Sequence, residues 1–344
     1  MKASRVLSLA VCCSLLPAAV WAADDTVKKM GDPPVKCTIT SISKDGIKYE
    51  KNGKEETVPS YAIESVRLAA EPAQLNLIRN QVNNGAYENA LKALDKIDPE
   101  TQENQDVKAE LTYLRAYSNA RLALGGGGNI SDAGQQINSF IKTYPNSFHF
   151  YPANELAGDL LVELGKHDAA TNFYKALSGS SADAWKIKAG IDIGRAKLSE
   201  KKFDEALKEF DTALELAEKD TKAETQKLSA MLGKAACLAQ TGKPEEGVKL
   251  AESVIGKLPT EEVDLHAWAY VVLGKCYRQM PDHNKQALLA FLHVDVLYFS
   301  NPQLHAEALW NLASLWQDLK KVDRATQATT LLKERYPNSA WAKL

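Results

Sequence analysis

The chain has 344 residues, of which 45% are hydrophobic and 25% charged, and its formal net charge is −2. These proportions are typical of a globular protein and exclude a largely disordered or fibrous chain. Binding of nucleic acid by bulk charge needs a basic excess, which this sequence lacks, so we expect no nucleic-acid partner. The length allows about two domains or one extended array of repeats.

The first 22 residues have the three parts of a secretory signal peptide. A short positive start and an apolar run, Val6–Leu16, precede Val20-Trp21-Ala22, which places small residues before a cleavage site. The apolar run is shorter than the roughly 20 residues that span a bilayer. We predict cleavage after Ala22 and export to the periplasm or cell envelope, where the mature chain is soluble and has no transmembrane segment. A lipid anchor on Cys12 or Cys13 is the alternative.

A small β module is predicted next. Residues 23–34 are polar and contain Pro33-Pro34, so we expect a flexible leader there. Residues 35–42 then alternate and are rich in β-branched side chains, and Asn52-Gly53 is a strong hairpin signal. We predict four or five short strands within residues 35–68, as in an SH3-like or Sm-like barrel. The module is either a folded cap before the helices or a separate module that binds a peptide or a surface.

From residue 69 onward the apolar period is helical, and similar segments recur about every 39 residues. A small residue recurs early in the second helix of each pair, and another lies 12 or 13 residues earlier, in the first helix. Two helices pack closely only where the facing side chains are small, so we predict about seven helix pairs over residues 72–344. The second-helix markers are Ala90, Ala133, Ala170, Ala206, Gly247, Ala287 and Ala325, and the first-helix markers are Gly158, Gly194, Ala235, Gly274 and Ala313.

These repeats resemble the tetratricopeptide repeat family. Leu273-Gly274-x-x-Tyr277 is similar to its first-helix signature, and Phe203-x-x-Ala206-Leu207-x-x-Phe210 is similar to its second-helix signature. Tyr144-Pro145-Asn146-Ser147 recurs as Tyr336-Pro337-Asn338-Ser339, an ending similar to that of periplasmic repeat proteins, such as the Tol-Pal coordinator and the repeat lipoprotein of outer-membrane assembly. The resemblance implies a mainly α, right-handed solenoid, whose concave surface is lined mainly by first helices and usually holds a peptide or a partner's segment.

The sequence offers no constellation for catalysis. Gly125–Gly128 lacks the Lys-Ser/Thr pair of a phosphate loop, so we interpret it as a flexible turn. His266 and His305 start equivalent helices about one repeat apart, too far to share a metal, and we expect them to pack or to be solvated at helix ends. Cys237 and Cys276 are also equivalent sites, about 10 Å apart by the repeat spacing, so we predict free, buried thiols. We expect no enzyme activity, cofactor or metal.

Five side chains fall on the first-helix stripe that should face the concave surface. Trp and Arg are favoured interface anchors because they bury a large area with few torsions. Helical spacings of three and seven residues place the side chains of each helix on one face. The alternative is that the Trp side chains pack against neighbouring helices. The predicted partner-binding residues are Trp268, Lys275, Arg278, Trp310 and Gln317.

The leading hypothesis is therefore a non-catalytic, exported scaffold that binds protein or peptide segments in its concave groove. A second hypothesis is structural: the array self-associates or acts as a spacer in the cell envelope, with the β module as the contact. An enzyme is the least favoured of the three, because no catalytic motif is visible.

Overall fold

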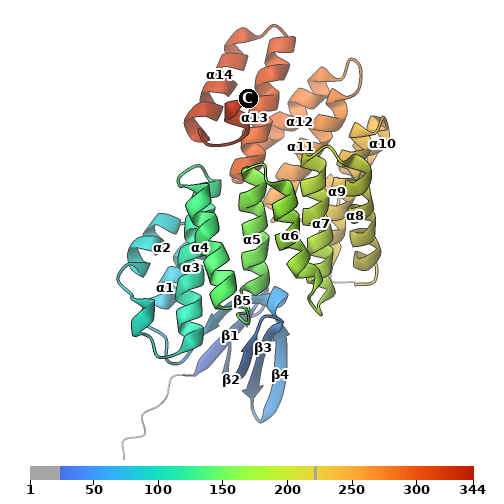
Figure 1. Cartoon of the computed structure of the whole chain (residues 1–344). Helices are drawn as coiled ribbons and strands as arrows, with labels where there is room; N and C mark the ends of the chain where they lie inside the picture. Colours follow the sequence, from blue (N-terminus) through green and yellow to red (C-terminus); the bar gives the residue numbers. More distant parts are fainter. Residues whose placement is uncertain (1–23, 221–222) are drawn as a thin grey trace, which may run out of the picture.

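The computed structural model describes residues 24–220 and 223–344. Within these residues the chain forms a five-stranded antiparallel sheet followed by fourteen α-helices in seven successive pairs (Figure 1). The predicted mainly α array of seven helix pairs behind a small β module is confirmed. The predicted signal peptide, residues 1–22, lies outside the described residues.

The β module has the strand order β4-β3-β2-β1-β5, with every neighbouring pair antiparallel. A short 3₁₀ helix, Ser60–Ala62, joins β4 to β5, an arrangement that fits the predicted SH3-like module. The β3–β4 hairpin turns at Asn52 and Gly53, which have φ values of 54° and 73°, as a tight primed turn requires. The strands are β1 Asp25–Lys29, β2 Val35–Ser43, β3 Gly46–Lys51, β4 Lys54–Pro59 and β5 Ile63–Arg67.

The predicted flexible leader over residues 23–34 is wrong for β1, which is an inner strand of the sheet between β2 and β5. Val27 in β1 is buried at 1% exposure. The Asp25 carboxylate accepts hydrogen bonds from the backbone N–H groups of Ile39 and Ala69, at 2.9 and 2.8 Å. A strand with one buried apolar residue gives almost no periodic signal in the sequence. Cross-strand pairing and the hydrogen bonds to the Asp25 carboxylate hold β1 in place instead.

The helices alternate between first and second members of each pair. Their bounds are α1 Leu75–Asn83, α2 Tyr87–Leu94, α3 Gln105–Leu124, α4 Ile130–Thr143, α5 Phe150–Glu163, α6 His167–Ser178, α7 Asp183–Ser199, α8 Phe203–Ala217, α9 Glu224–Gln240, α10 Pro244–Ile255, α11 Val263–Arg278, α12 Asn284–Leu297, α13 Pro302–Asp318 and α14 Val322–Arg335.

The small markers lie where the helices of a pair approach. A Cβ added to Gly194 in α7 would lie 2.8 Å from two carbons of the buried Phe210 ring in α8. Gly274 in α11 meets the ring of Phe291 in α12 at 2.7 Å in the same way. The fifth pair differs, because Gly233 is the α9 residue that faces Phe210 of the preceding pair. Large rings thus fill the space that the small residues leave.

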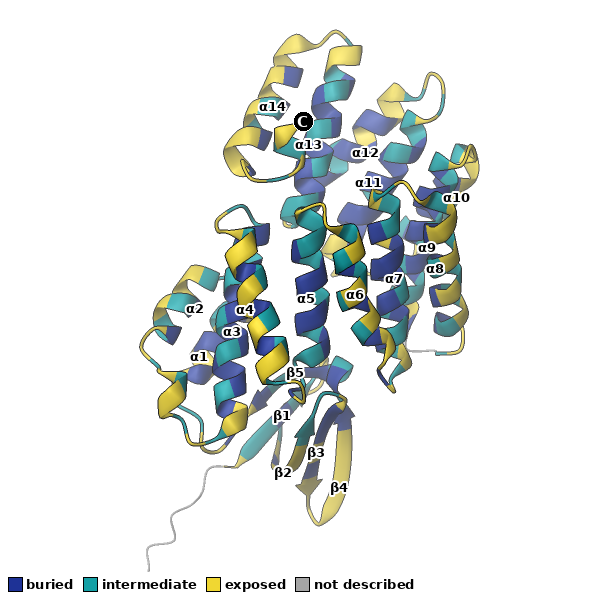
Figure 2. Cartoon of the chain, in the orientation of Figure 1, coloured by how far each residue is buried: buried dark blue, intermediate teal, exposed yellow. Residues whose placement is uncertain are grey.

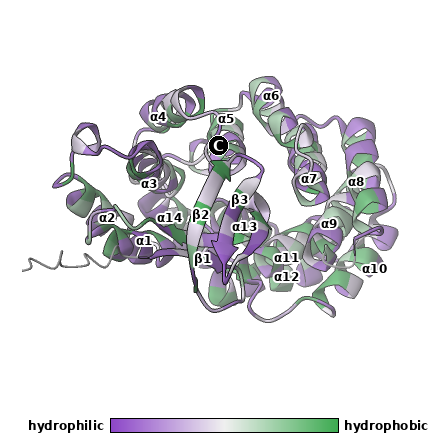
Figure 3. Cartoon of the chain, turned by 90° about the horizontal axis from the view of Figure 1, so that it is seen from below, coloured by the Kyte–Doolittle hydropathy of each residue, from purple (hydrophilic) through white to green (hydrophobic). Residues whose placement is uncertain are grey.

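The β module packs against the array at several places along the chain. Tyr151 of α5 donates a hydrogen bond from its hydroxyl to Asp45 at 3.0 Å. Trp185 of α7 donates from its indole N–H to the Ser60 hydroxyl, also at 3.0 Å. Figure 1 shows the sheet below the lower ends of α3 and α5, and Figure 3 shows the helix pairs in an arc around it. The β module is therefore joined to the array at its third and fourth helix pairs.

Candidate functional site

The first helices line the inner face of the arc. Successive first helices pack on one another, as α7 on α9, α9 on α11 and α11 on α13, whereas each second helix packs mainly on the first helices beside it. Elements that touch their next-but-one neighbours lie on the inside of a curved array. Figure 2 shows the inner helices α5 and α7 largely buried, and α4 with a broad exposed face. We call the inner surface of α5, α7, α9, α11 and α13 the groove.

Two of the predicted groove residues, Lys275 and Arg278, lie on α11. Both bond to α13, the first helix of the following pair. The Lys275 ammonium donates to Glu307 at 2.9 Å, and 40% of the Lys275 side chain is exposed. The Arg278 guanidinium donates to Asn311 at 3.0 Å and to the Ser314 hydroxyl at 3.2 Å. These bonds hold two cationic groups in place along the groove without burying them completely.

The two predicted tryptophans lie in different surroundings. Trp268 is buried at 8% exposure, and the guanidinium of Arg195 from α7 lies over its ring at 4.7 Å. Trp310 is half-buried, and its ring contacts that of Trp341 with centroids 5.2 Å apart. Gln317 is exposed. Trp310 and Gln317 therefore present surface beside the groove, while Trp268 in this conformation is covered by Arg195.

A charged cluster on α5 and α7 was not predicted. The Lys188 ammonium donates to Glu155 at 3.0 Å and to Asp192 at 3.1 Å, joining the two helices. Tyr174 donates from its hydroxyl to Asp159 at 2.8 Å. Burial and the nearby charges of Glu155 and Asp159 raise the pKa of Asp192 to about 7, although Lys188 opposes this shift. The cluster therefore sets the carboxyl groups of Glu155, Asp159 and Asp192 against the positive charges of Lys188 and Arg195.

The repeat register gave a signal for this cluster. Gly194 and Gly274 are equivalent markers, so Lys188, six residues before Gly194, is equivalent to Trp268, six residues before Gly274. By the same count Arg195 is equivalent to Lys275. The rule that selected the predicted groove residues on α11 also selects charged residues on α7, and applying it to all the first helices would have found them.

The residues that follow α14 contact the second and third helix pairs. The Asn338 side chain donates to the Gly126 carbonyl at 3.1 Å, and the Ala340 N–H donates to the Glu163 carboxylate at 3.2 Å. Gly126, with φ of 85°, belongs to the four-glycine turn between α3 and α4. We call residues 336–344 the closing segment, because they connect the seventh helix pair to the second and third. The glycine turn is therefore a contact surface as well as a connection.

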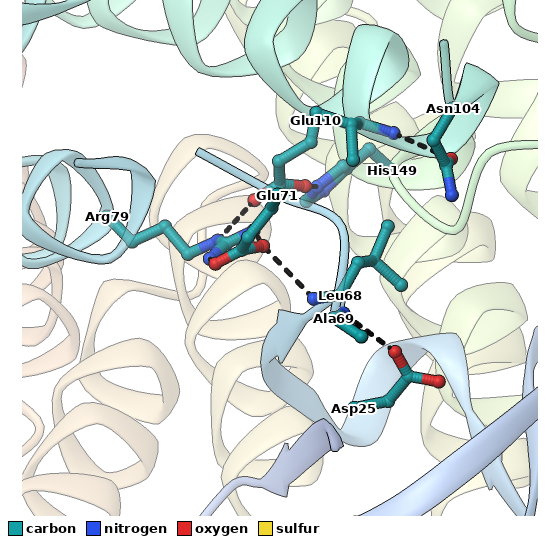
Figure 4. Close-up of polar contacts among 9 residues, drawn as sticks. Asp25, Leu68, Ala69, Glu71, Arg79, Asn104, Glu110 and His149 are labelled. Atoms are coloured by element: carbon teal, nitrogen blue, oxygen red, sulfur yellow. Dashed lines mark hydrogen bonds and ion pairs between the residues drawn. The ribbon is translucent and has the colours of Figure 1, made fainter. Parts of the chain in front are cut away.

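A buried ionic network joins the β module to the first three helix pairs (Figure 4). Arg79 donates to Glu110 at 2.7 Å and to both oxygens of Glu71, at 2.7 and 2.8 Å. Glu110 also contacts His149 at 2.7 Å, and Glu71 accepts the N–H of Leu68 at 3.0 Å. Burial alone would raise the pKa of Glu110, but Arg79 and His149 hold it at about 2. Because these carboxylates are buried and fully partnered, the network holds the joint together and is not a binding site.

The residues that were predicted to pack do so. Cys237 and Cys276 are free and fully buried, and burial raises the pKa of each thiol to about 12. His266 stacks on Tyr298 with ring centroids 5.0 Å apart. His305 is fully buried, and its two ring nitrogens contact Asp295 and Tyr336. The predictions of buried thiols and packed histidines are confirmed.

Comparison with known proteins agrees with this geometry. Residues 307–339, which span most of α13 and all of α14, match the family model of the tetratricopeptide repeat. The fold is a tetratricopeptide-repeat-like solenoid. A tetratricopeptide repeat protein from Parabacteroides merdae ATCC 43184 has a similar structure, with a TM-score of 0.53 and 17% identity over 78% of this chain and 96% of that one. No curated protein matches the sequence.

Two further solenoid structures contain bound peptides or factors. A Rap protein complexed with Competence and Sporulation Factor has a TM-score of 0.56 and 17% identity, over 78% of this chain and 76% of that one. NprR in complex with its cognate peptide NprX has a TM-score of 0.53 and 14% identity, over 78% of this chain and 81% of that one. At these identities the likeness establishes the fold alone. In the described residues no helix has the length and apolar character needed to cross a membrane.

Proposed function

We propose that this chain is a non-catalytic scaffold that binds linear segments of partner proteins in its groove. The observation that carries the proposal is the set of polar and aromatic side chains that keep exposed surface on the first helices α5, α7, α11 and α13. They are Glu155, Lys188, Lys275, Trp310 and Gln317. Side chains at helical spacing along the inside of an arc can contact successive residues of one extended or helical segment. Similar solenoids bind peptides, as the NprR complex with NprX illustrates.

We further propose that binding takes place in the cell envelope. The support is the sequence of residues 1–22, where a positive start, an apolar run and a small-residue cleavage site follow one another. Intact mass spectrometry of the protein purified from its native host tests this proposal. A mature chain that begins at Ala23 is expected. A chain that keeps residues 1–22, or carries a diacylglyceryl group on Cys12 or Cys13, contradicts it.

A random peptide library displayed on phage tests groove binding. Binders are selected with the full chain, synthesised, and measured by isothermal titration calorimetry. Lys275→Ala and Arg278→Ala should each weaken the selected peptides about tenfold, because each removes a charged donor worth about 1.4 kcal/mol or more. Lys249→Ala on α10 is the matched control, since Lys249 is an exposed lysine of a second helix. Failure to select any peptide, or equal losses for the Lys275 and Lys249 variants, refutes groove binding.

A second candidate function, self-association, is supported by α12. Its outward face exposes Leu289, Val296 and Leu297 at 58%, 62% and 59%, so three large aliphatic side chains lie in solvent on one helix. A second copy of the chain would remove this surface from water. Sedimentation velocity over a hundredfold concentration range distinguishes the candidates, and Val296→Lys should abolish any dimer that uses this face.

A further inference from the structure

The closing segment packs on the seventh helix pair, α13 and α14, and reaches the end of α5. Trp341 places its ring on Trp310, which is on the predicted groove stripe of α13. One residue earlier, the Ala340 N–H donates to Glu163, at the end of α5. The segment has little structure of its own beyond a single 3₁₀ turn over Trp341–Lys343. Its contacts are therefore those that a short linear segment makes with a surface built by other helices.

We propose that the surface between Trp310 and Glu163 is a recognition site for a linear segment that carries an aromatic residue, and that the closing segment occupies this site as an intramolecular ligand. The proposal rests on the proposed function and narrows it to one surface and one peptide chemistry. The partner then binds by displacing the last part of the closing segment, residues 339–344.

The aromatic requirement follows from Trp310. An aromatic ring beside a half-buried indole gains both buried area and a favourable ring–ring contact. The two rings lie 5.2 Å apart at an interplanar angle of 45°, a tilted geometry that Phe or Tyr in a partner reproduces as well as Trp does. Trp341 and Ala342 also pack against the apolar core of the last three helix pairs. The site therefore selects a flat apolar side chain.

Glu163 adds a backbone contact to the site, because it accepts the Ala340 N–H at 3.2 Å. Burial raises the pKa of this carboxyl group, while the Ala340 N–H and the charge of Lys343 act in the opposite direction. A partner that displaces the closing segment removes both of these favourable interactions.

Covalent connection gives the closing segment an advantage over any free peptide. A segment tethered a few residues from its site has an effective concentration of about 1 mM. A free peptide with the same contacts must compete against that concentration, so the wild-type chain should bind it weakly. Weakening the closing segment should then increase the apparent affinity for the free peptide.

The test uses a fluorescein-labelled synthetic peptide with the sequence of residues 336–344, YPNSAWAKL. Fluorescence anisotropy measures its binding to the full-length wild-type chain and to the full-length variant Trp341→Ala. We expect the variant to bind the peptide at least tenfold more tightly, because its own segment no longer fills the aromatic site. The same peptide with alanine in place of its tryptophan should lose about 30-fold in affinity, the loss typical of an anchor residue.

Two further variants locate the bound peptide and guard against misfolding. Adding Trp310→Ala to the Trp341→Ala chain should abolish the gain. Ala340→Pro offers a second way to release the segment, since it removes the N–H that donates to Glu163, and Ala340 has a φ of −57°, which proline adopts. Val322→Ala, at an exposed position of α14, is the control and should bind like the wild type.

Equal affinities for the wild type, Trp341→Ala and Ala340→Pro overturn the proposal, and so does peptide binding that survives loss of Trp310. These outcomes are separable from failure of the proposed function. If library peptides bind the groove through Lys275 and Arg278 while YPNSAWAKL never binds, groove binding stands and the closing segment is only a structural strap. If YPNSAWAKL binds the released chain and no library peptide does, the closing segment is an intramolecular ligand of its site, and the proposed binding of partner segments is refuted.

Discussion

Replacement of Gly194 by alanine tests the packing rule on which the array is built. A Cβ at this position of α7 would lie 2.8 Å from two carbons of the Phe210 ring and 3.0 Å from a third. Ordinary contacts of this kind begin at about 3.4 Å, so the ring or the helix must move by more than half an ångström. The ring cannot move away easily, because Phe210 is fully buried and Gly233 of α9 also lies close against it.

Two opposing effects set the magnitude. Overpacking of a well-filled core costs about 1–3 kcal/mol. Alanine in a helix interior gains about 1 kcal/mol over glycine. The difference between these terms predicts that Gly194→Ala destabilises the chain by up to about 2 kcal/mol. Gly134→Ala, in α4, is the matched control: nothing lies within 4 Å of an added Cβ, so the same substitution should stabilise the chain by about 0.5–1 kcal/mol.

Guanidinium unfolding followed by circular dichroism measures both variants. Hydrogen exchange of residues 183–217 locates the effect, since a repeat array can unfold in parts. A double-mutant cycle with Phe210→Leu then isolates the contact, and a coupling energy of about 1 kcal/mol or more is expected because the smaller side chain leaves room for the new methyl group. The reasoning is refuted if Gly194→Ala is as stable as Gly134→Ala, or if the cycle shows no coupling.

Three other predictions concern buried polar groups and thiols. Glu110→Ala should lower the free energy of unfolding at pH 7 by about 3–5 kcal/mol, as measured by urea denaturation, because it leaves the charge of Arg79 in the core with one partner fewer. Cys237 and Cys276 should resist maleimide in the native state and react only after denaturation, since both thiols are buried with pKa values raised to about 12. Asp192→Asn should stabilise the chain at pH 8 and have little effect at pH 4. The folded pKa of Asp192, about 7, exceeds the unfolded value of about 3.9, so stability falls as pH rises between them. The gain at pH 8 is at most about 4 kcal/mol, from three units at about 1.4 kcal/mol each, and pH-dependent unfolding curves of both chains check it.

Local patterns account for what could be predicted from the sequence. The seven pairs, their turns and the small residues between them follow from apolar periodicity within each repeat. Residues such as Gly194 and Gly274 could therefore be identified from the sequence. The burial of Cys237 and Cys276 followed from the same register. β1 did not, because a strand with one buried residue, Val27, depends on partners elsewhere in the chain.

Contacts between distant repeats could not be predicted, because they depend on the curvature of the array. Arg195 reaches Trp268 across α9 only because the first helices lie on the inside of a tight arc. The meeting of Asn338 with Gly126 joins positions 212 residues apart, and no repeat period contains that relation. Sequence reasoning placed Trp268, Lys275 and Trp310 on one stripe, but what covers each residue of the stripe is decided by the superhelix.

These distant contacts also bear on how the array unfolds. An open solenoid gains stability only between neighbouring repeats, so its ends can fray independently. Here the β module bonds to the third and fourth pairs through Tyr151 and Trp185, and the closing segment bonds the seventh pair to the second and third. Because of these contacts, unfolding of a repeat at one end also breaks contacts with repeats in the middle of the array. Release of the closing segment by a partner would therefore loosen the seventh pair while the β module still holds the first four, and the groove would open from one end only.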